Sequence, residues 1–565
     1  MVATHDPSVS NEQPEPEGER LSVNFVHHPM GFPPRVTGRP LSPRLDTLDG
    51  KTVFLVDCHF DDSGLLLEQI HAWFGEHMPR VRVEFVAKAN VYGRDDPELW
   101  ARIKKEGDAA IIGVGHCSSC APAVAAHGMS LDGDTGVPTV MLHTATFERV
   151  VRSTARMAGM PRMRAAFVPM PVMGKTPTEL RAYVDGNDPT TGRPVMQEVV
   201  EGLTATLEAA DQAPESFERS TPRLVPPDSE EKLHELFLRN HWTDTLPIVL
   251  PTDARVREML AHTSHPADEI VGQMRPTGHR EAWACDVEKV AVNAVMAGAR
   301  PEYFPVILAL ASTGISSRGS STSSMASLVV VNGPIREEIG MNSGTGAMGP
   351  YNQANATIGR AYGLLSQNLQ GGSVLGTTYM GSQGNGYSFT NLTFAENEER
   401  SPWEPFHVEQ GFPPSASTVS VFGSVWHTGF TLGLRQSWRS AVHRMLLGMD
   451  PLCKPLFVLD PIAARQFVEK AGFSAKAELA AWAAETARIP ARDYWDYQLI
   501  QNYIFPRATS GEEPYATMLK AGPDELIPMF TPASIHTVVV GGETNGYWRL
   551  FSASHTKTVS IDDWR

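Results

Sequence analysis

Two cysteines three residues apart, Cys117 and Cys120, form the pattern in this sequence with the clearest chemical meaning. They follow a predicted strand over residues 109–114 and precede a helix that we expect to begin near Ala121. Free N–H groups and the dipole at a helix N-terminus stabilise a thiolate, and they lower a thiol pKa from about 8.5 toward neutrality. A second thiol three residues later can attack a mixed disulfide and release the product. The pattern predicts Cys117 as a nucleophile and Cys120 as its resolving thiol.

Further thiol and imidazole groups stand at the ends of other predicted strands. Cys58 and His59 follow the first strand, His116 precedes Cys117 after the third, and His143 ends the fourth. The carboxyl ends of parallel strands meet at one edge of a sheet, where ligands bind. We therefore expect these side chains in one crevice, with His116 and His143 as acid–base candidates, Cys58 as a further catalytic thiol and His59 as a substrate contact.

The same side chains are also donors that suit zinc, copper or iron. The metal-ligand candidates are Cys58, His59, Cys117, Cys120 and His143. The paired C-x-x-C spacing of structural zinc sites is absent, and Ala121 follows Cys120 where haem attachment requires histidine. No cofactor is certain from the sequence. Three alternatives stay open: a metal-dependent lyase or hydrolase, a non-catalytic protein that binds a thiophilic ion or metabolite, and ordinary burial of single cysteines.

Strands and helices alternate through the first third of the chain, which is typical of a parallel sheet covered by helices. We predict strands at 52–56, 81–86, 109–114, 138–142 and 164–168, with helices at 65–74, 97–105, 121–127 and 147–157. This spacing indicates a flavodoxin-like α/β domain. The domain plan is a flexible arm over 1–45, this domain over 46–185, a connector over 186–224, and a larger α/β or α+β domain over 225–565. We expect a ligand crevice between the two domains.

Composition excludes several classes of partner. The 565 residues carry a net charge of −16, which disfavours nucleic acid and anionic lipid. No apolar run approaches the ~18 residues of a membrane span, and no secretory signal precedes residue 20. Five cysteines are too few for a disulfide framework, which fits a reducing, cytoplasmic location. We expect no nucleic-acid or membrane partner, and a homo-oligomer stays open.

The thiol turn reads Gly113-Val-Gly-His-Cys-Ser-Ser-Cys120, and Gly136-Val-Pro-Thr-Val140 and Phe147 follow it. In these stretches the chain resembles the UGSC-motif (seleno)protein family, whose signature is Sec/Cys-Gly-Ser-Cys after a strand and Gly-x-Gly-x. The resemblance places Cys117 at the selenocysteine position and Cys120 at the second thiol. It also places Lys88 at a basic position, which implies contact with the substrate. The family supplies a redox-like motif but no substrate.

The sequence departs from the family motif at Ser118, which stands where the family has glycine. A Cβ disfavours a positive φ, so we expect a regular helical N-terminus. Cys117 should then lie at or near the N-cap as the more exposed thiol. Cys120 should lie one turn later.

The C-terminal region is similar to the domain often found with this family. The similar stretches are 290–298, 331–334, 341–344, 355–360 and 395–404. Within them Asn332, Asn342 and Ser343 stand in Gly-rich loops that can present amides to a carboxylate or phosphate, which makes them substrate-binding candidates. An ordinary turn role is equally open for them. There is neither a Walker lysine nor a G-x-G-x-x-G after a strand.

These observations together predict a thiol-dependent enzyme. We expect a small organic substrate, reductive or eliminative cleavage of a carbon–heteroatom bond, and an external thiol reductant as a possible partner.

Overall fold

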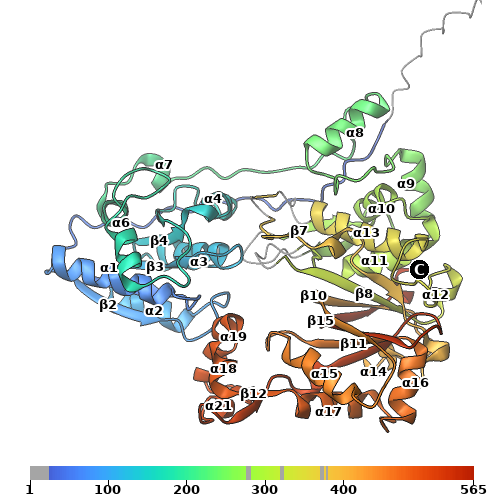
Figure 1. The fold of residues 1–565 in the computed structure, drawn as a ribbon. Helices are drawn as coiled ribbons and strands as arrows, with labels where there is room; N and C mark the ends of the chain where they lie inside the picture. Colours follow the sequence, from blue (N-terminus) through green and yellow to red (C-terminus); the bar gives the residue numbers. More distant parts are fainter. Residues whose placement is uncertain (1–24, 275–281, 319–323, 370–374, 377–378) are drawn as a thin grey trace, which may run out of the picture.

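The computed structural model describes residues 25–274, 282–318, 324–369, 375–376 and 379–565. The chain forms two α/β bodies that are joined by an extended two-stranded strap (Figure 1). No helix in these described ranges is long and apolar enough to cross a membrane.

The N-terminal body is built on five parallel strands in the order β2-β1-β3-β4-β5. The strands are β1 (Thr52–Asp57), β2 (Arg82–Ala87), β3 (Ala109–Gly115), β4 (Thr139–Thr144) and β5 (Ala165–Val168). Strands β1, β3 and β4 are buried along their whole length, which explains their continuous apolar sequences. The predicted parallel α/β domain is confirmed, and its strand order is that of the flavodoxin type.

Three helices cover each face of this sheet. One apolar cluster joins the sheet to α2 (Pro97–Glu106), α3 (Cys120–Met129) and α4 (Glu148–Met157). The other cluster joins it to α1 (Ser63–His77), α5 (Pro177–Val184) and α6 (Val195–Thr204). Helix α6 lies in the predicted connector, but its residues Val195, Val199 and Leu203 are buried in the second cluster. The connector therefore begins after α6.

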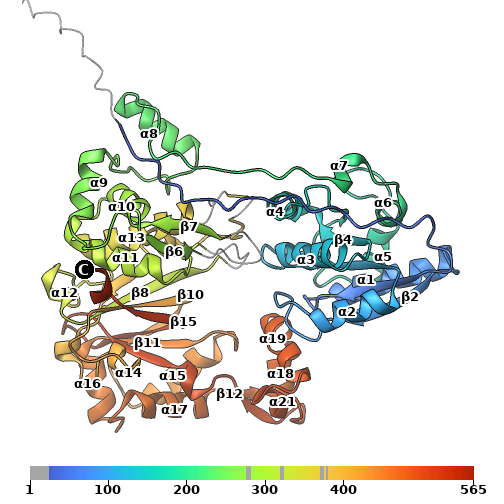
Figure 2. The same cartoon turned by 180° about the vertical axis from the view of Figure 1, so that it is seen from behind.

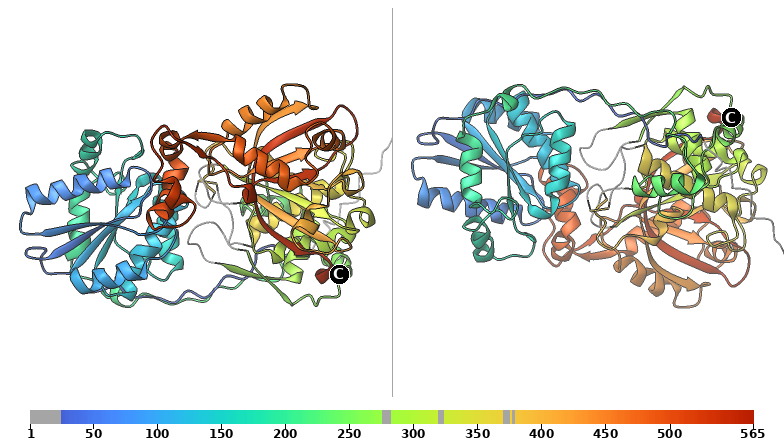
Figure 3. Two further views of the ribbon diagram at one scale, coloured as in Figure 1. Left: turned by 90° about the horizontal axis from the view of Figure 1, so that it is seen from below. Right: turned by 90° about the horizontal axis from the view of Figure 1, so that it is seen from above.

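Residues 25–45 differ from the flexible arm that their composition predicts. Val26 pairs with Thr252 and is fully buried in the C-terminal body, and Val36 pairs with Phe217 of the returning connector. The arm and the connector run side by side between the two bodies (Figures 2 and 3). Scattered apolar anchors hold this segment, and they carry no periodicity that a sequence reveals. The rest of the predicted arm, 1–24, lies outside the described residues.

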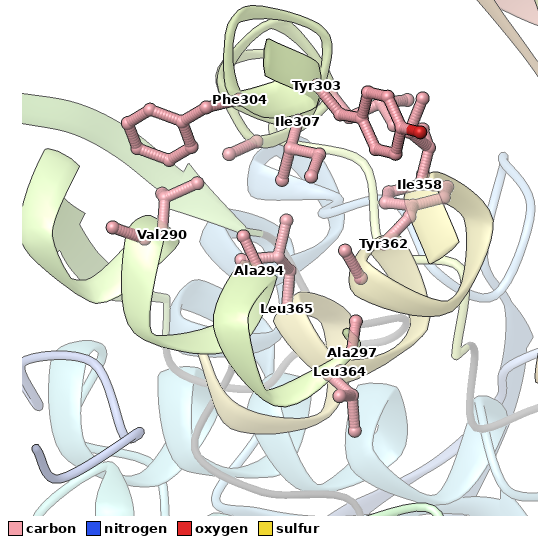
Figure 4. Packing of buried hydrophobic residues seen from close by; sticks show 14 of the residues in the cluster. Val290, Ala294, Ala297, Tyr303, Phe304, Ile307, Ile358, Tyr362, Leu364 and Leu365 are labelled. Atoms are coloured by element: carbon pink, nitrogen blue, oxygen red, sulfur yellow. The ribbon is translucent and has the colours of Figure 1, made fainter. Parts of the chain in front are cut away.

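The C-terminal body contains a six-stranded mixed sheet in the order β14-β11-β15-β10-β8-β9. Its strands are β8 (Ala326–Asn332), β9 (Thr393–Ala395), β10 (Thr418–Leu432), β11 (Pro455–Leu459), β14 (His536–Val539) and β15 (Tyr547–Ser560). Helices α10 (Val287–Met296), α11 (Phe304–Ser312) and α13 (Gln353–Asn368) form the largest core, in which Phe304, Ile307 and Leu365 converge (Figure 4). The predicted larger α/β region is thus confirmed, with a mixed sheet.

A second core in this body contains α15 (Trp438–Leu447), α16 (Pro461–Glu469) and α17 (Lys476–Thr486). The connector contains α7 (Ala209–Gln212). Further elements of the C-terminal body are α8 (Glu230–Arg239), α9 (Asp253–Leu260), β6 (Ile270–Met274), β7 (Trp283–Asp286), α12 (Ile335–Glu338) and α14 (Phe406–Glu409).

A small helical extension of the C-terminal body reaches back to the N-terminal sheet. It comprises β12 (Arg488–Pro490), α18 (Ala491–Asp496), α19 (Gln498–Tyr503), α20 (Phe505–Thr509), α21 (Tyr515–Met518) and β13 (Leu526–Pro528). Helix α19 bonds to the loop after β1, at the carboxyl edge of the parallel sheet (Figure 1). The extension therefore brings C-terminal side chains to the edge where the thiols lie.

Candidate functional site

The Cys117–Cys120 turn connects β3 to α3. The Cys117 carbonyl accepts the first helical hydrogen bond, from the Ala121 N–H at 3.0 Å. Pro122 has no N–H to continue the ladder, so the regular helix begins at Cys120. Cys117 consequently lies in the turn directly before α3, and Cys120 is the first residue of the helix.

The two thiols exchange hydrogen bonds with each other's backbone. The Cys120 N–H donates to Cys117 Sγ, and the Cys117 N–H donates to Cys120 Sγ, each at 2.9 Å. Both cysteines are free, and Cys117 is 7% exposed whereas Cys120 is 0% exposed. The two bonds are reciprocal like those of a capping box, but they close the turn before α3, because Ser119 rather than Cys117 is the N-cap of that helix.

The two thiols differ in acidity. Burial raises the pKa of Cys117, but hydrogen bonds from Cys120 and Ser119 outweigh it and bring the pKa below the ordinary value. Burial, with a further contribution from Cys117, raises the pKa of Cys120 well above the ordinary value. The first proton that this pair loses therefore comes from Cys117.

A chain of hydroxyl groups runs from Cys117 into the C-terminal body. Ser119 Oγ lies 3.3 Å from Cys117 Sγ, Tyr92 Oη lies 2.9 Å from Ser119 Oγ, and Tyr503 Oη lies 2.7 Å from Tyr92 Oη. Burial raises the pKa of both tyrosines, so they stay protonated and can donate. Sequence reasoning missed Tyr92 and Tyr503, because no motif marks them and only the fold brings Tyr503 here.

His116 and Asp61 form the other side of the site. His116 Nε2 lies 2.8 Å from the Phe60 carbonyl, and its Nδ1 lies 3.9 Å from Asp61 Oδ2. Burial lowers the pKa of His116 although the Phe60 carbonyl and Asp61 oppose the shift, so its neutral form is favoured. The Asp61 Oδ1 accepts from the side-chain amides of Gln498 at 2.8 Å and Asn502 at 3.0 Å. Asp61 thus ties the loop after β1 to α19.

Cys58 lies at the same sheet edge as the thiol turn, since its N–H donates to the Gly113 carbonyl at 2.8 Å. It is fully buried in the cluster under α2, α3 and α4, and this burial raises the pKa of its thiol. His59 places Nδ1 3.5 Å from Asp57 Oδ2, at the sheet edge. Neither Cys58 nor His59 lines the pocket described below.

Lys88 and His143 lie behind the pocket. Lys88 is 1% exposed, donates to the Arg94 carbonyl and lies over the Trp100 ring. His143 is fully buried against the Gly115 backbone, where a Cβ would lie 2.1 Å from its Nδ1. Burial lowers the pKa of His143 to about 3, so it is neutral. The structure gives Lys88 and His143 supporting positions rather than contacts with a bound molecule.

The candidates of the C-terminal region lie in hydrogen-bonded loops of their own body. Asn332 donates to Glu396 and Glu398, Asn342 donates to Asn352, and the Ser343 carbonyl accepts from Gly541. None of Asn332, Asn342 and Ser343 lines the thiol pocket. The structure does not bring these three residues to Cys117.

A pocket of about 870 Å³ opens between the two bodies at the thiol turn. It is lined by Phe60, Asp61, Tyr92, His116, Cys117, Ser119, Thr146, Phe147, Met170, Pro171 and Met173 of the N-terminal body, and by Met325, Met380, Ser382, Ser424, Leu452, Gln498, Leu499 and Tyr503 of the C-terminal body. Cys117 is the one cysteine among these lining residues. Of the sequence candidates, Cys117 and His116 face the pocket, and Cys120 lies directly behind Cys117.

The metal-ligand candidates do not converge in the described part of the chain. There, no group of three or more His, Cys, Asp or Glu side chains is placed to hold a metal ion. Cys58 and His143 lie in the apolar interior, whereas His59 faces Asp57.

Fold and site define a flavodoxin-like α/β domain with a Cys-x-x-Cys turn at its ligand-binding edge. Residues 25–205 match the UGSC family, so this N-terminal region is a UGSC-family region. The match contains the thiol turn and Tyr92, and it extends over the arm and α6 as well. No curated protein matches the chain. The similarity of the C-terminal region to a domain associated with this family stays a prediction.

Proposed function

We propose that this chain is a thiol-dependent enzyme that cleaves a carbon–heteroatom bond of a small organic substrate in the interdomain pocket. One observation carries the proposal: the thiol with the lowered pKa is the one that faces the pocket, and its partner lies directly behind it. A nucleophile and a resolving thiol require this arrangement.

The reductive reaction has two steps. The Cys117 thiolate attacks the carbon that carries the heteroatom, a C–S bond forms, and the heteroatom leaves with the bonding electrons. The Cys120 thiol then attacks Cys117 Sγ, the S–S bond forms, the C–S bond breaks, and the organic fragment leaves as a carbanion that takes the Cys120 proton. The substrate gains two electrons, the pair becomes a disulfide, and an external dithiol restores it.

This reaction requires a substrate fragment that tolerates carbanion character, such as a carbon next to a carbonyl group. An eliminative reaction, by contrast, leaves both thiols reduced. The redox state of the pair after a single turnover therefore separates the two reactions.

The hydroxyl chain supports the first step. Ser119 can donate to the Cys117 thiolate, and Tyr92 and Tyr503 can each donate to the next hydroxyl in the chain. Such a chain spreads the charge of the thiolate without a nearby cation.

The test is alkylation by iodoacetamide at a series of pH values, with each cysteine read by peptide mass spectrometry. We expect Cys117 to react about tenfold or more faster than Cys453 at pH 7, with its titration midpoint below that of an ordinary thiol. Cys453 is the internal control, because it is only half-buried and burial raises its pKa. Slow labelling of Cys117 and Cys453 at equal rates would contradict the proposal.

The alternatives predict other outcomes in the same preparation. A metal-dependent lyase or hydrolase predicts stoichiometric metal in protein purified without chelators and activity lost on its removal. A binding protein predicts tight binding without turnover. A Cys117–Cys120 disulfide that forms after one turnover and is reopened by a dithiol supports the reductive reaction alone.

A further inference from the structure

The described residues that line the interdomain pocket include no lysine or arginine that would pair with an anion. A carboxylate or phosphate in this pocket would lose its water without gaining a counter-ion.

The charges near the pocket have the wrong sign for an anion. Asp57, Asp61 and Asp62 all act on the His116 ring, and His116 is neutral because burial lowers its pKa. The Cys117 thiolate itself adds negative charge at the reacting atom. Asp61 Oδ1 already accepts from the amides of Gln498 and Asn502, and its Oδ2 lies 3.9 Å from His116 Nδ1, which carries no proton when Nε2 donates to the Phe60 carbonyl. A cation would therefore exchange its water for a single free carboxylate oxygen.

Many of the side chains that line the pocket are apolar, and several of them are flexible. Each body contributes two methionines, which are Met170 and Met173 on one side and Met325 and Met380 on the other. Phe60 and Phe147 add aromatic surface. Methionine is flexible and polarizable, so such walls adapt to apolar groups of varied shape. Besides Asp61, His116 and Gln498, the polar side chains that line the pocket carry hydroxyls, which suit neutral hydrogen-bonding groups.

We infer that this pocket takes an uncharged organic molecule that is apolar over most of its surface and presents its reactive carbon to Cys117. The statement that a carbon of this molecule reacts with Cys117 rests on the proposed function. The statement that the molecule is uncharged rests on the residues that line the pocket. It excludes free carboxylates, phosphates and ammonium compounds as preferred substrates.

The test compares three methanethiosulfonates that share one reactive group: the neutral methyl, the anionic sulfonatoethyl and the cationic trimethylammonioethyl reagents. The rate of Cys117 modification is divided by the rate of each reagent with free cysteine. We expect the normalised rate of the neutral reagent to exceed that of the anionic reagent by about tenfold or more, with the cationic reagent also slower. A higher normalised rate for the anionic or the cationic reagent than for the neutral one would overturn the inference, whatever the absolute reactivity of Cys117.

A matched pair of variants sharpens this test. Met173 lines the pocket and is 46% exposed, so both Met173→Lys and Met173→Leu leave the core untouched. The lysine should raise the normalised rate of the anionic reagent severalfold, whereas the leucine should leave the order of the three reagents unchanged. An anionic rate that is equal in both variants would show that the charge of the pocket does not control access.

A second measurement keeps the inference separate from the thiol chemistry. In Cys117→Ser protein, a neutral solvatochromic dye should bind with blue-shifted emission, and Met173→Lys should weaken that binding more than Met173→Leu. Dye binding with an unreactive Cys117 in the parent protein would reject the proposed function and keep the pocket assignment. A reactive Cys117 without dye binding would reject the assignment of an apolar pocket and keep the proposed function.

Discussion

Two polar clusters of this molecule look alike in sequence and differ in structure. One is the thiol turn at the end of β3, and the other surrounds Asn332 at the end of β8. At the second cluster the charges are paired: Arg336 bonds to Glu398 and Glu399, and Lys476 lies 3.4 Å from Glu396 and 3.3 Å from Glu409. At the first, Cys117 faces an apolar pocket with hydroxyls rather than a cation beside it.

The difference shows what separates a reactive strand end from a structural one. Both clusters combine glycine with polar or ionisable residues after a buried strand, which is the pattern that marks ligand sites in sequence. Mutual pairing in the Asn332 cluster satisfies its charges internally and stabilises the turn. At the thiol turn, S–H, O–H and N–H donors rather than a cation stabilise the charge on Cys117, so the sulfur keeps its reactivity toward a molecule in the pocket.

The largest expected effect is that of replacing Cys117. Cys117→Ser should remove the fast-labelling thiol and lower turnover by about a thousandfold or more, because the nucleophile is lost. Cys120→Ser should keep the fast labelling but prevent the internal disulfide, since a serine hydroxyl can still accept the Cys117 N–H. The measurement is peptide-resolved labelling together with mass analysis of oxidised protein.

Cys58→Ala is the matched control for these two variants, because Cys58 shares the sheet edge but not the pocket. Loss of fast labelling in Cys58→Ala, with the fold intact, would move the nucleophile to a different strand end.

The second prediction concerns the close packing of Gly115 against His143 and the start of α3. Gly115→Ala would place a Cβ 2.1 Å from His143 Nδ1 and 2.9 Å from the Ala121 Cα. We expect a loss of about 2–3 kcal/mol in the free energy of unfolding, measured by denaturant titration, and slower labelling of Cys117. Gly75→Ala in α1 is the control, since nothing lies within 4 Å of that added Cβ. Equal stability of the two variants would contradict the geometry of the turn.

The sequence predicted the N-terminal sheet well because its strands are continuous apolar runs with clear ends. Each of the five predicted strands lies within two residues of the observed one, and the thiol turn follows β3 as expected. Helix α6 falls in the predicted connector because an Asp-Pro pair, glycines and clusters of charged residues surround it in the sequence. The bonding of Val26 and Val36 depends on segments far along the chain, which no local pattern encodes.

Only part of the candidate site could be predicted from the sequence. Cys117, Cys120 and His116 stand in one motif, so spacing alone brings them together. Tyr503 and Asn502 reach the site on a helix from the far end of the chain, and no signal within their own segment marks them. Conversely, His143 and Lys88 stand at strand ends, where functional residues are expected, but His143 packs against the turn at Gly115 and Lys88 donates to the Arg94 carbonyl.

The third effect concerns the paired cluster and is read in the pH dependence of stability. Burial raises the pKa of Glu409 to about 7, although Lys476 opposes the shift. Because the folded state then binds more protons than the unfolded state between about pH 4.5 and 7, Glu409 should make stability fall as pH rises through that window. Glu409→Gln should remove on the order of 1–2 kcal/mol of this change. Denaturant titrations at pH 5 and pH 8 measure it, and Glu469→Gln is the exposed control, since Glu469 does not act on Glu409.

The smallest effect tests the hydroxyl chain across the two bodies. Tyr503→Phe removes the outermost hydroxyl, which lies 2.7 Å from Tyr92 Oη, and keeps the ring that packs beside Tyr92. Because the Tyr503 hydroxyl is not itself bonded to Cys117 Sγ, we expect the labelling midpoint of Cys117 to rise by only about half a pH unit. Tyr92→Phe, which removes the direct donor to Ser119, should raise it further, by up to about one unit. Tyr497→Phe is the control, since it lies on the same helical extension and outside the chain of hydroxyls. An equal shift of the midpoint in the control and in Tyr503→Phe would contradict a role of the Tyr503 hydroxyl in stabilising the Cys117 thiolate. The C-terminal body would then line the pocket without affecting the Cys117 pKa.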